Sequence, residues 1–326
     1  MRMQMIEARA EHPVRISVVI PHLNQPVMLE RCLKSLKAGR RQPDEIIVVD
    51  NGSQSMPSDI CNGFSKVRLL KETQPGPGPA RNLGVAASVG DVLAFIDADC
   101  LADPDWLTTA EQAMSDPRAE ILGGDVRIAY VDPAHLTTLE AYESIYAYRM
   151  DRYIAREGFT GTGNLVVRRA VLQDVGPFAG IGIAEDIDWG KRATGSGFTI
   201  RFVPKMRVYH PARVHFNELK SKWDRHIAHA FEAGGNGAKG RLLWAAKTIA
   251  LMLSPVYEIP QVLASDRIKG PSSRLRALLG LTRVRFYRAR VMAWLLFGGD
   301  ASILSGRWNR AGMETTKAKP KNSFLS

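Results

Sequence analysis

The 326-residue sequence predicts an α/β fold in which helices flank an open sheet. Two observations lead to this fold class. Short apolar runs of strand length alternate with segments whose apolar residues recur at helical spacing, and several of these runs end in acidic or polar residues. This alternation is typical of sheets with helical crossovers, whose ligand sites lie at the carboxyl edge of the sheet.

The first hundred residues supply most of the expected strands. Four apolar runs predict them, at 15–21, 45–50, 67–72 and 91–100. Between the first two runs, Leu29, Leu33 and Leu36 have helical spacing and predict a helix over 26–38. The PGPGP stretch at 75–79 argues against regular structure, and the small residues that follow it favour a helix packed close to the sheet.

The segment beyond Pro104 predicts a helix to about Met114 and then a pair of strands around 119–130. A helix is expected over 135–156, because Tyr142, Tyr146 and Tyr153 share one helical face. A Gly-rich loop follows at 158–164. Two strand-like segments, FTIRFVP and MRVYHP, end this part of the chain.

Composition narrows the class of protein. Apolar residues make up 45% and charged residues 24%, which is ordinary globular usage and excludes wholesale disorder. Three isolated cysteines exclude a disulfide scaffold and a CxxC zinc site, and they fit a reducing compartment. Charged residues precede the first apolar run, so no secretory signal is expected.

Charge divides the chain unevenly. Residues 214–326 carry 19 Lys and Arg against 7 Asp and Glu, a net of +12, whereas residues 1–213 carry 25 against 26. A basic region of this kind indicates a polyanionic partner, either nucleic acid or an anionic membrane surface. We therefore expect two domains, a catalytic domain at 1–213 and a helical, basic region at 214–326.

The C-terminal region favours a membrane surface over nucleic acid. The apolar segment 242–263 is interrupted by charges and prolines and falls short of a clean membrane span. Arginines interleave with Leu and Phe over 274–290, the composition of a helix in a membrane interface. The alternative is a helical subdomain with a solvated basic face.

Acidic residues fall where strands of the expected sheet end. Asp97 and Asp99 are two residues apart, so an extended chain points both side chains the same way. Converging carboxylates can hold Mg²⁺ or Mn²⁺, and such a cation stabilises a diphosphate as a leaving group. A D-x-D triplet alone is weak evidence, and its position after an apolar strand strengthens it.

Four motifs together resemble the inverting family 2 glycosyltransferases of the GT-A fold. They are ISVVIPHLNQ, EIIVVDNGSQ, GPGPARNLGVAASVGDVLAFIDADC and AEDIDWGKR, and they span about residues 14–212. The resemblance implies a Rossmann-like open mixed sheet, a nucleotide-sugar donor, Mg²⁺ or Mn²⁺, and a single displacement that inverts the anomeric centre. Among donors, a UDP-sugar is expected.

The resemblance also implies donor-binding residues. These are Pro21, Asn24, Asp50, Asn51, Gly52, Arg81 and Asp97. Pro21 and Asn24 would line the nucleoside pocket, and Asp50 would accept a hydrogen bond from the base. Arg81 would lie near the ribose or diphosphate.

Metal, base and acceptor sites follow from the same motifs. Asp99 would hold the metal, with Asp97 and His210 as further ligands. The general base, which takes the acceptor's proton, would be Asp186, with Glu185 as the alternative. The acceptor side would include Gly163, Asn164 and Trp189.

The expected function is sugar transfer to a hydroxyl of a glycan or lipid-linked acceptor, in cell-surface polysaccharide or glycolipid synthesis. The enzyme would be cytoplasmic and peripheral at the inner face of the cell membrane, and no nucleic acid partner is expected. Two alternatives remain, a nucleotidyltransferase acting on sugar phosphates and a non-catalytic basic protein that binds membrane or nucleic acid. The first would need a basic Gly-rich loop after the first strand, which IPHLN lacks.

Overall fold

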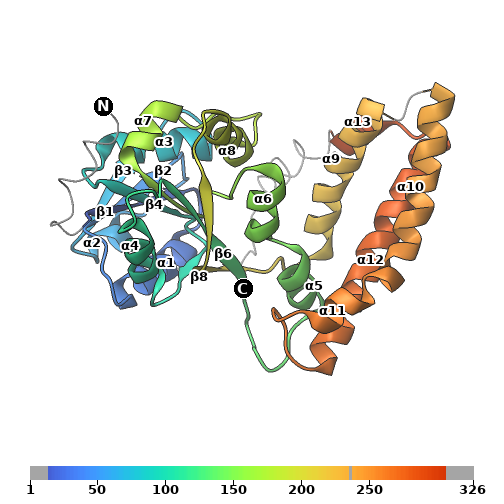
Figure 1. The fold of residues 1–326 in the computed structure, drawn as a ribbon, viewed down its shortest axis with the longest axis horizontal. Coiled ribbons are helices and arrows are strands. Elements are labelled where there is room, and N and C mark those ends of the chain that lie inside the picture. Colours follow the sequence, from blue (N-terminus) through green and yellow to red (C-terminus); the bar gives the residue numbers. More distant parts are fainter. Residues whose placement is uncertain (1–13, 235–236, 306–326) are drawn as a thin grey trace, which may run out of the picture. The chain divides into compact units, whose positions relative to one another are not determined.

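A computed structural model describes residues 14–234 and 237–305, which form two compact units (Figure 1). The first unit contains the described residues up to Ala129 together with Tyr148–Pro211. The second contains Tyr130–Ala147 and the described residues from Ala212 onward. Residues 130–147 therefore join the helical unit, although the sequence placed them in the catalytic domain.

An eight-stranded mixed sheet forms the centre of the first unit, in the order β3-β2-β1-β4-β7-β6-β8-β5. Its strands are β1 (Ile16–His22), β2 (Glu45–Asp50), β3 (Val67–Lys71), β4 (Val92–Ile96), β5 (Leu101–Ala102), β6 (Ile121–Ala129), β7 (Asn164–Arg168) and β8 (Ile200–Pro211). Strands β3, β2, β1 and β4 are parallel, and β7 is antiparallel to β4 and β6. The predicted open mixed sheet is confirmed.

Strands β1, β2 and β4 are almost wholly buried, as expected for strands covered on both faces, whereas the edge strand β3 is partly exposed. In this register His22 lies opposite Asp50 at the carboxyl ends of β1 and β2. The neighbouring strand β4 ends at Ile96, immediately before Asp97. Polar groups from three adjacent strands are thus delivered to one edge of the sheet.

The helices of the first unit are α1 (Pro26–Ala38), α2 (Ser58–Asn62), α3 (Pro77–Ala87), α4 (Trp106–Met114), α6 (Met150–Glu157), α7 (Arg169–Val175) and α8 (Glu185–Gly195). Helix α1 has the predicted bounds, and its apolar stripe is buried. Helix α3 begins inside the PGPGP stretch, so the prediction of irregular structure there was wrong. Pro77 and Pro79 occupy the first turn, where a missing N–H costs no intrahelical hydrogen bond.

Two further sequence predictions need correction. Residues around 119–130 form the single strand β6 rather than a pair. The helix expected over 135–156 is broken into α5 (Thr138–Tyr146) and α6, because Tyr148 adopts a left-handed backbone conformation with φ of +50°. The tyrosine stripe is therefore divided, and Tyr153 stacks on Phe159 inside the first unit.

The second unit is helical and is built around α12 (Pro271–Leu296). Its other helices are α5, α9 (Phe216–Gly234), α10 (Gly237–Tyr257), α11 (Ile259–Ala264) and α13 (Ala301–Ser305). Buried residues of α12 such as Ala277, Leu281 and Val284 pack inside the unit, against α5, α9 and α11. Leu275, Leu279 and Phe286 of the same helix remain exposed, so α12 has a buried face and an exposed apolar face.

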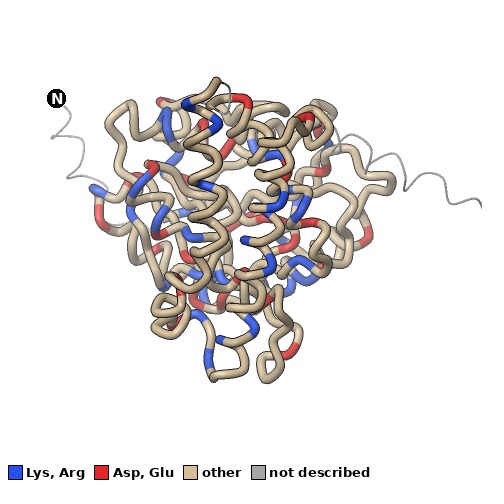
Figure 2. The backbone as a smooth tube through the Cα atoms, turned by 90° about the vertical axis from the view of Figure 1, so that its right-hand side faces the viewer, with Lys and Arg blue, Asp and Glu red and all other residues tan. Residues whose placement is uncertain are grey.

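Exposed apolar side chains also lie on α10. Leu242, Ile249, Leu253 and Val256 follow helical spacing and are each at least 60% exposed. Figure 2 shows Lys and Arg spread along the helices of this unit, with few Asp or Glu among them. Within residues 14–234 and 237–305, no helix combines the length and apolarity needed to cross a bilayer.

Close packing of α3 on β1 depends on Gly84. A β-carbon at this position would lie 2.4 Å from Cγ1 of the buried residue Val19. We expect Gly84→Ala to lower the free energy of unfolding by about 1–3 kcal/mol, because the strand or helix must shift. Urea denaturation followed by circular dichroism measures this.

The matched control is Gly195→Ala at the end of α8, where a β-carbon meets no atom within 4 Å. Its unfolding free energy should stay the same or rise slightly. Equal losses in the two variants would contradict the packing argument.

Candidate active site at the carboxyl edge of the sheet

A buried histidine–aspartate pair closes the ends of β1 and β2. His22 Nδ1 lies 2.9 Å from Asp50 Oδ1, and both side chains are inaccessible to solvent. The backbone N–H of Gln25 donates to His22 Nε2 at 3.2 Å, so the ring proton on Nδ1 is donated to Asp50. Burial would raise the pKa of Asp50, but hydrogen bonds from Ser53 and His22 outweigh it and hold this pKa below its ordinary value.

This arrangement changes the expected role of Asp50. One carboxylate oxygen accepts from His22 and the other from the backbone N–H of Ser53 at 3.1 Å. A nucleobase therefore finds neither oxygen exposed, and the predicted hydrogen bond from base to Asp50 does not fit. The carboxylate instead fixes the turn that follows β2.

The loops after β1 and β2 are tied together. The N–H of Asn24 donates to Ser53 Oγ at 2.8 Å, and Asn24 Oδ1 accepts from the N–H of Gln54 at 2.9 Å. Asn24 and Gly52 both have positive φ, +53° and +90°, which allows this tight turn. The half-buried Pro21 lies in β1 opposite Val49.

Asn51 anchors the loop that leads into α3. Its amide donates to the carbonyl of Gln74 at 2.8 Å, and its Oδ1 accepts from the N–H of Gly76 at 2.6 Å. The side chain thus holds the backbone immediately before the helix that carries Arg81.

Arg81 joins two carboxylates from distant segments. Its Nη2 donates to Asp97 Oδ1 at 2.7 Å and its Nη1 to Glu185 Oε1 at 2.8 Å. The arginine side chain is 3% exposed, whereas those of Asp97 and Glu185 are 35% and 19% exposed. Arg81 Nε is buried without a hydrogen-bond partner. Three elements meet here, α3, the end of β4 and the first turn of α8.

Gly163 gives Asp97 its space. A β-carbon on this glycine would lie 2.7 Å from Asp97 Oδ2, so any larger residue would displace the carboxylate. Sequence reasoning placed Gly163 on the acceptor side, and the structure brings it against a predicted donor residue.

Asp99 and His210 form a second cluster. His210 Nε2 lies 3.4 Å from Asp99 Oδ2, and one ligand atom from each of Asp99, Cys100 and His210 lies within 4.8 Å of the others. Burial raises the pKa of Asp99; His210 opposes this shift and Asp97 adds to it. Asp97 lies outside this cluster, and Tyr148 packs its ring on His210 with centroids 4.6 Å apart.

The two acids that open α8 have different surroundings. Glu185 accepts a hydrogen bond from Arg81. Asp186 accepts one from the backbone N–H of the adjacent Ile187, at 2.8 Å. Burial raises the pKa of Asp186, and the neighbouring charge of Glu185 raises it further. A carboxylate with a raised pKa is suited to take a proton.

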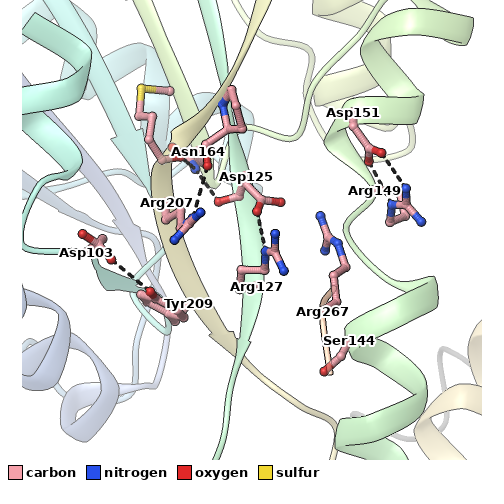
Figure 3. Close-up of polar contacts among 12 residues, drawn as sticks. Asp103, Asp125, Arg127, Ser144, Arg149, Asp151, Asn164, Arg207, Tyr209 and Arg267 are labelled. Carbon is pink, nitrogen blue, oxygen red and sulfur yellow. Dashed lines mark hydrogen bonds and ion pairs between the residues drawn. The ribbon is translucent and has the colours of Figure 1, made fainter. Parts of the chain in front are cut away.

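Two predicted acceptor residues serve the core instead. Asn164 is fully buried, and its Oδ1 accepts a hydrogen bond from Trp106 Nε1. Its amide nitrogen donates to the carbonyls of Asp125 and Met206, where β8 bulges away from β6 (Figure 3). Trp189 is 2% exposed and donates to the carbonyl of Gly176. Neither side chain is available to a ligand, so the acceptor-side prediction for both was wrong.

Sequence reasoning missed three residues of this site, His22, Cys100 and Tyr148. A polar residue at the end of the first strand, matching Asp50 at the end of the second, was a usable signal for His22. The sequence held no such signal for Cys100 and Tyr148, because strand and turn geometry bring them close to Asp99 and His210.

The fold and its acidic edge define a glycosyltransferase of the GT-A class, and comparisons with known proteins agree. The family model described as Glycosyl transferase family 2 matches residues 17–176. Glycosyltransferase AglE of Haloferax volcanii is 35% identical over 215 residues, which cover 64% of this chain and 70% of that protein. The chain belongs to glycosyl transferase family 2.

Other similar proteins are more distant. The probable glycosyltransferase YdaM of Bacillus subtilis is 29% identical over 58% of this chain and 49% of its own. The mannosyltransferase PcManGT of Pyrobaculum calidifontis, solved with GDP-Man and Mn²⁺, has a TM-score of 0.50 at 15% identity, covering 96% of this chain and 86% of its own. Glucosyl-3-phosphoglycerate synthase of Mycobacterium tuberculosis has a TM-score of 0.50 at 21% identity, covering 70% of this chain and 82% of its own. It was solved with Mn²⁺, UDP-glucose and phosphoglyceric acid. These structures share the fold.

Removal of the buried guanidinium should destabilise the site. Arg81→Met leaves two carboxylates without their common cation, and we expect a loss of about 2–3 kcal/mol in unfolding free energy. The loss is smaller than for a fully buried pair because Asp97 is partly exposed. Addition of Glu185→Gln should restore part of it, which a double-mutant cycle measures.

Arg15→Met is the control, since its pair with Asp91 is 3.5 Å long and more than half exposed. It should change stability by less than about 0.5 kcal/mol. An Arg81 variant as stable as the Arg15 variant would show that the bridge contributes nothing to folding.

Proposed function

We propose that the protein is a metal-dependent, inverting glycosyltransferase that moves a sugar from a nucleotide-diphosphate donor to a hydroxyl group. The observation that carries this proposal is the Arg81 bridge, which brings the carboxylate after β4 to the acids of α8. A donor site and a base must lie together for a single displacement. Family membership favours this function over a nucleotidyltransferase.

The donor would lie along the loops after β1, β2 and β4. Asn24, Gly52 and Asn51 shape the first two loops, and Asp50 acts as a positioning residue through Ser53. Asp97, which is partly exposed, would face the ribose and diphosphate, and the buried Arg81 would position it. The structural neighbours were solved with GDP-Man or UDP-glucose, and we favour a UDP-sugar for this chain.

Asp99 and His210 would hold Mn²⁺ or Mg²⁺. Carboxylate oxygen and imidazole nitrogen are suitable donors, and their ligand atoms already lie within 4.8 Å of one another. When bound, the ion neutralises charge on the departing diphosphate. Asp97, predicted as a further ligand, has one oxygen engaged with Arg81 and would contribute only through the other.

Asp186 would act as the general base. The acceptor oxygen forms its bond to the anomeric carbon as the bond to the diphosphate oxygen breaks, and the hydroxyl proton passes to the Asp186 carboxylate. Glu185, held by Arg81, positions the start of α8. Attack from the side opposite the leaving group inverts the anomeric centre.

The acceptor would be a glycan or a lipid-linked sugar, in cell-surface polysaccharide or glycolipid synthesis at the cytoplasmic face of the cell membrane. The net charge of +12 over residues 214–326 and the exposed apolar stripe of α10 support an anionic membrane surface as partner. Leu and Val side chains suit lipid better than bases, so nucleic acid is not expected.

Metal and donor should stabilise the protein together. A ligand that binds the folded state raises the melting temperature, by an amount set by its concentration relative to Kd. We expect Mn²⁺ with UDP to raise it in a thermal-shift assay, and Asp99→Asn or His210→Gln to abolish the Mn²⁺-dependent part. The control His135→Gln replaces an exposed histidine paired with Asp132. An undiminished Mn²⁺ effect in both site variants would remove these residues from the metal site.

Loss of the base should separate catalysis from donor binding. Asp186→Asn should reduce kcat by about 10²–10⁴-fold with donor KM nearly unchanged. Because the pKa of Asp186 is raised, wild-type kcat/KM should fall as pH drops through a value above that of an ordinary aspartate. Steady-state kinetics across pH test this.

Asp188→Asn, in the same helical turn but paired with Arg192, serves as control and should stay within a few-fold of wild type. If Glu185→Gln loses kcat with donor KM unchanged while Asp186→Asn does not, the base is Glu185.

Membrane binding should depend on α10. Ile249→Glu with Leu253→Glu places two acids on the exposed stripe, and vesicles of 70% phosphatidylcholine and 30% phosphatidylglycerol should then no longer co-sediment with the protein. Val89→Glu, at an exposed apolar position of the first unit, should leave co-sedimentation intact. Vesicle binding that survives the α10 substitutions contradicts this role.

A further inference from the structure

A pocket of about 450 Å³ lies within the second unit, between α9, α10 and α12. This volume is in the range of small-molecule sites. One part of the pocket wall is apolar and is formed by Ile227, Trp244, Leu251 and Met292. Trp244 and Met292 are held in place by a hydrogen bond from the indole N–H to the Met292 carbonyl at 3.0 Å.

The polar part of the wall is cationic. Lys247 from α10 and Arg288 from α12 line the pocket together with His226 from α9. Among the described residues that line it, none is acidic. Burial lowers the pKa of His226, and the positive charges of Lys222, Arg225, Arg288 and His229 lower it further. These charges make the region around His226 strongly positive.

An aromatic ring holds the guanidinium of Arg288 in place. The guanidinium lies over the ring of Trp223, 3.8 Å from the centroid, which fixes its position. The neighbouring Arg285 forms an ion pair with Glu258, whereas no ion pair is shown for Arg288 within the described residues. Because the Arg288 side chain also lines the pocket, its guanidinium can contact an anionic oxygen placed there.

We propose that this pocket binds one molecule of a long-chain lipid phosphate, with the chain against the apolar wall and the phosphate between Lys247 and Arg288. Arginine and lysine are the side chains that recognise phosphate, and the apolar wall explains why a free phosphate would not suffice. The exposed stripe of α10, which adjoins the pocket-lining residues Lys247, Ala250 and Leu251 on the same helix, lets such a lipid enter from a membrane. This inference goes beyond the proposed sugar transfer and does not depend on it.

Isothermal titration calorimetry of the full chain tests the proposal, with decyl phosphate below its micellar concentration as the probe. We expect saturable binding of one molecule per chain, and binding at least about tenfold weaker for decanol and for inorganic phosphate. Lys247→Gln should weaken decyl phosphate about tenfold, because one charge-assisted contact is lost. Ala250→Trp, which fills the pocket from its exposed wall, should abolish binding.

Lys239→Gln is the matched control, since Lys239 lies exposed on α10 outside the pocket-lining set and carries the same charge. It should bind like wild type. Three results would overturn the proposal: decanol binding as tightly as decyl phosphate, inorganic phosphate doing so, or equal affinities in the Lys247 and Lys239 variants. Because the assay measures binding alone, its failure would leave the sugar-transfer proposal untouched.

Discussion

The Arg81 bridge is the interaction on which the rest of the site depends. One buried guanidinium holds the carboxylate that follows β4 and the first acid of α8, which lie 16 and 104 residues away in sequence. Without a shared cation, these two carboxylates would repel each other in a partly desolvated place. The ion pairs of both carboxylates with Arg81 set the position of α8, and therefore of Asp186. In the proposed mechanism, this side chain connects the donor side with the acceptor side.

Different kinds of constraint support the bridge. Asn51 fixes the backbone before α3, so the helix that carries Arg81 starts at a defined place. Gly163 leaves room for Asp97, and the buried pair of His22 and Asp50 closes the first two strands. These residues need not touch substrate to matter, because each holds a loop or strand end whose position the site requires.

Strands β1 to β4, helix α1 and the acidic edge were predictable, because buried parallel strands and amphipathic helices leave clear apolar periods in a sequence. The structure adds the ion pairs of Arg81 as the physical cause that brings Asp97 and Glu185 together. The roles of Asn164 and Trp189 could not be predicted, since the sequence does not show whether a polar or aromatic side chain faces a ligand or is buried in the core. The break at Tyr148 and the start of α3 at Pro77 depend on backbone conformations that propensity alone does not specify.

The C-terminal unit shows the same limit. Interleaved Arg and Leu over 274–290 indicated a helix in a membrane interface, yet the small and branched residues of α12 pack among four helices, α5, α9, α10 and α11. Exposed apolar side chains remain on both α12 and α10. A sequence reveals that a helix has apolar residues, but the number of helices that pack around it decides which of them remain exposed.

Chemical rescue of Arg81→Ala shows whether the Arg81 cation assembles the site. Release of nucleoside diphosphate is measured for the donor, UDP-glucose or GDP-mannose, that wild type turns over faster, with and without millimolar guanidinium chloride. We expect the variant to lose activity, and we expect guanidinium, but not sodium chloride at equal ionic strength, to restore part of it. Full activity in the variant without guanidinium would contradict the claim that this cation assembles the site.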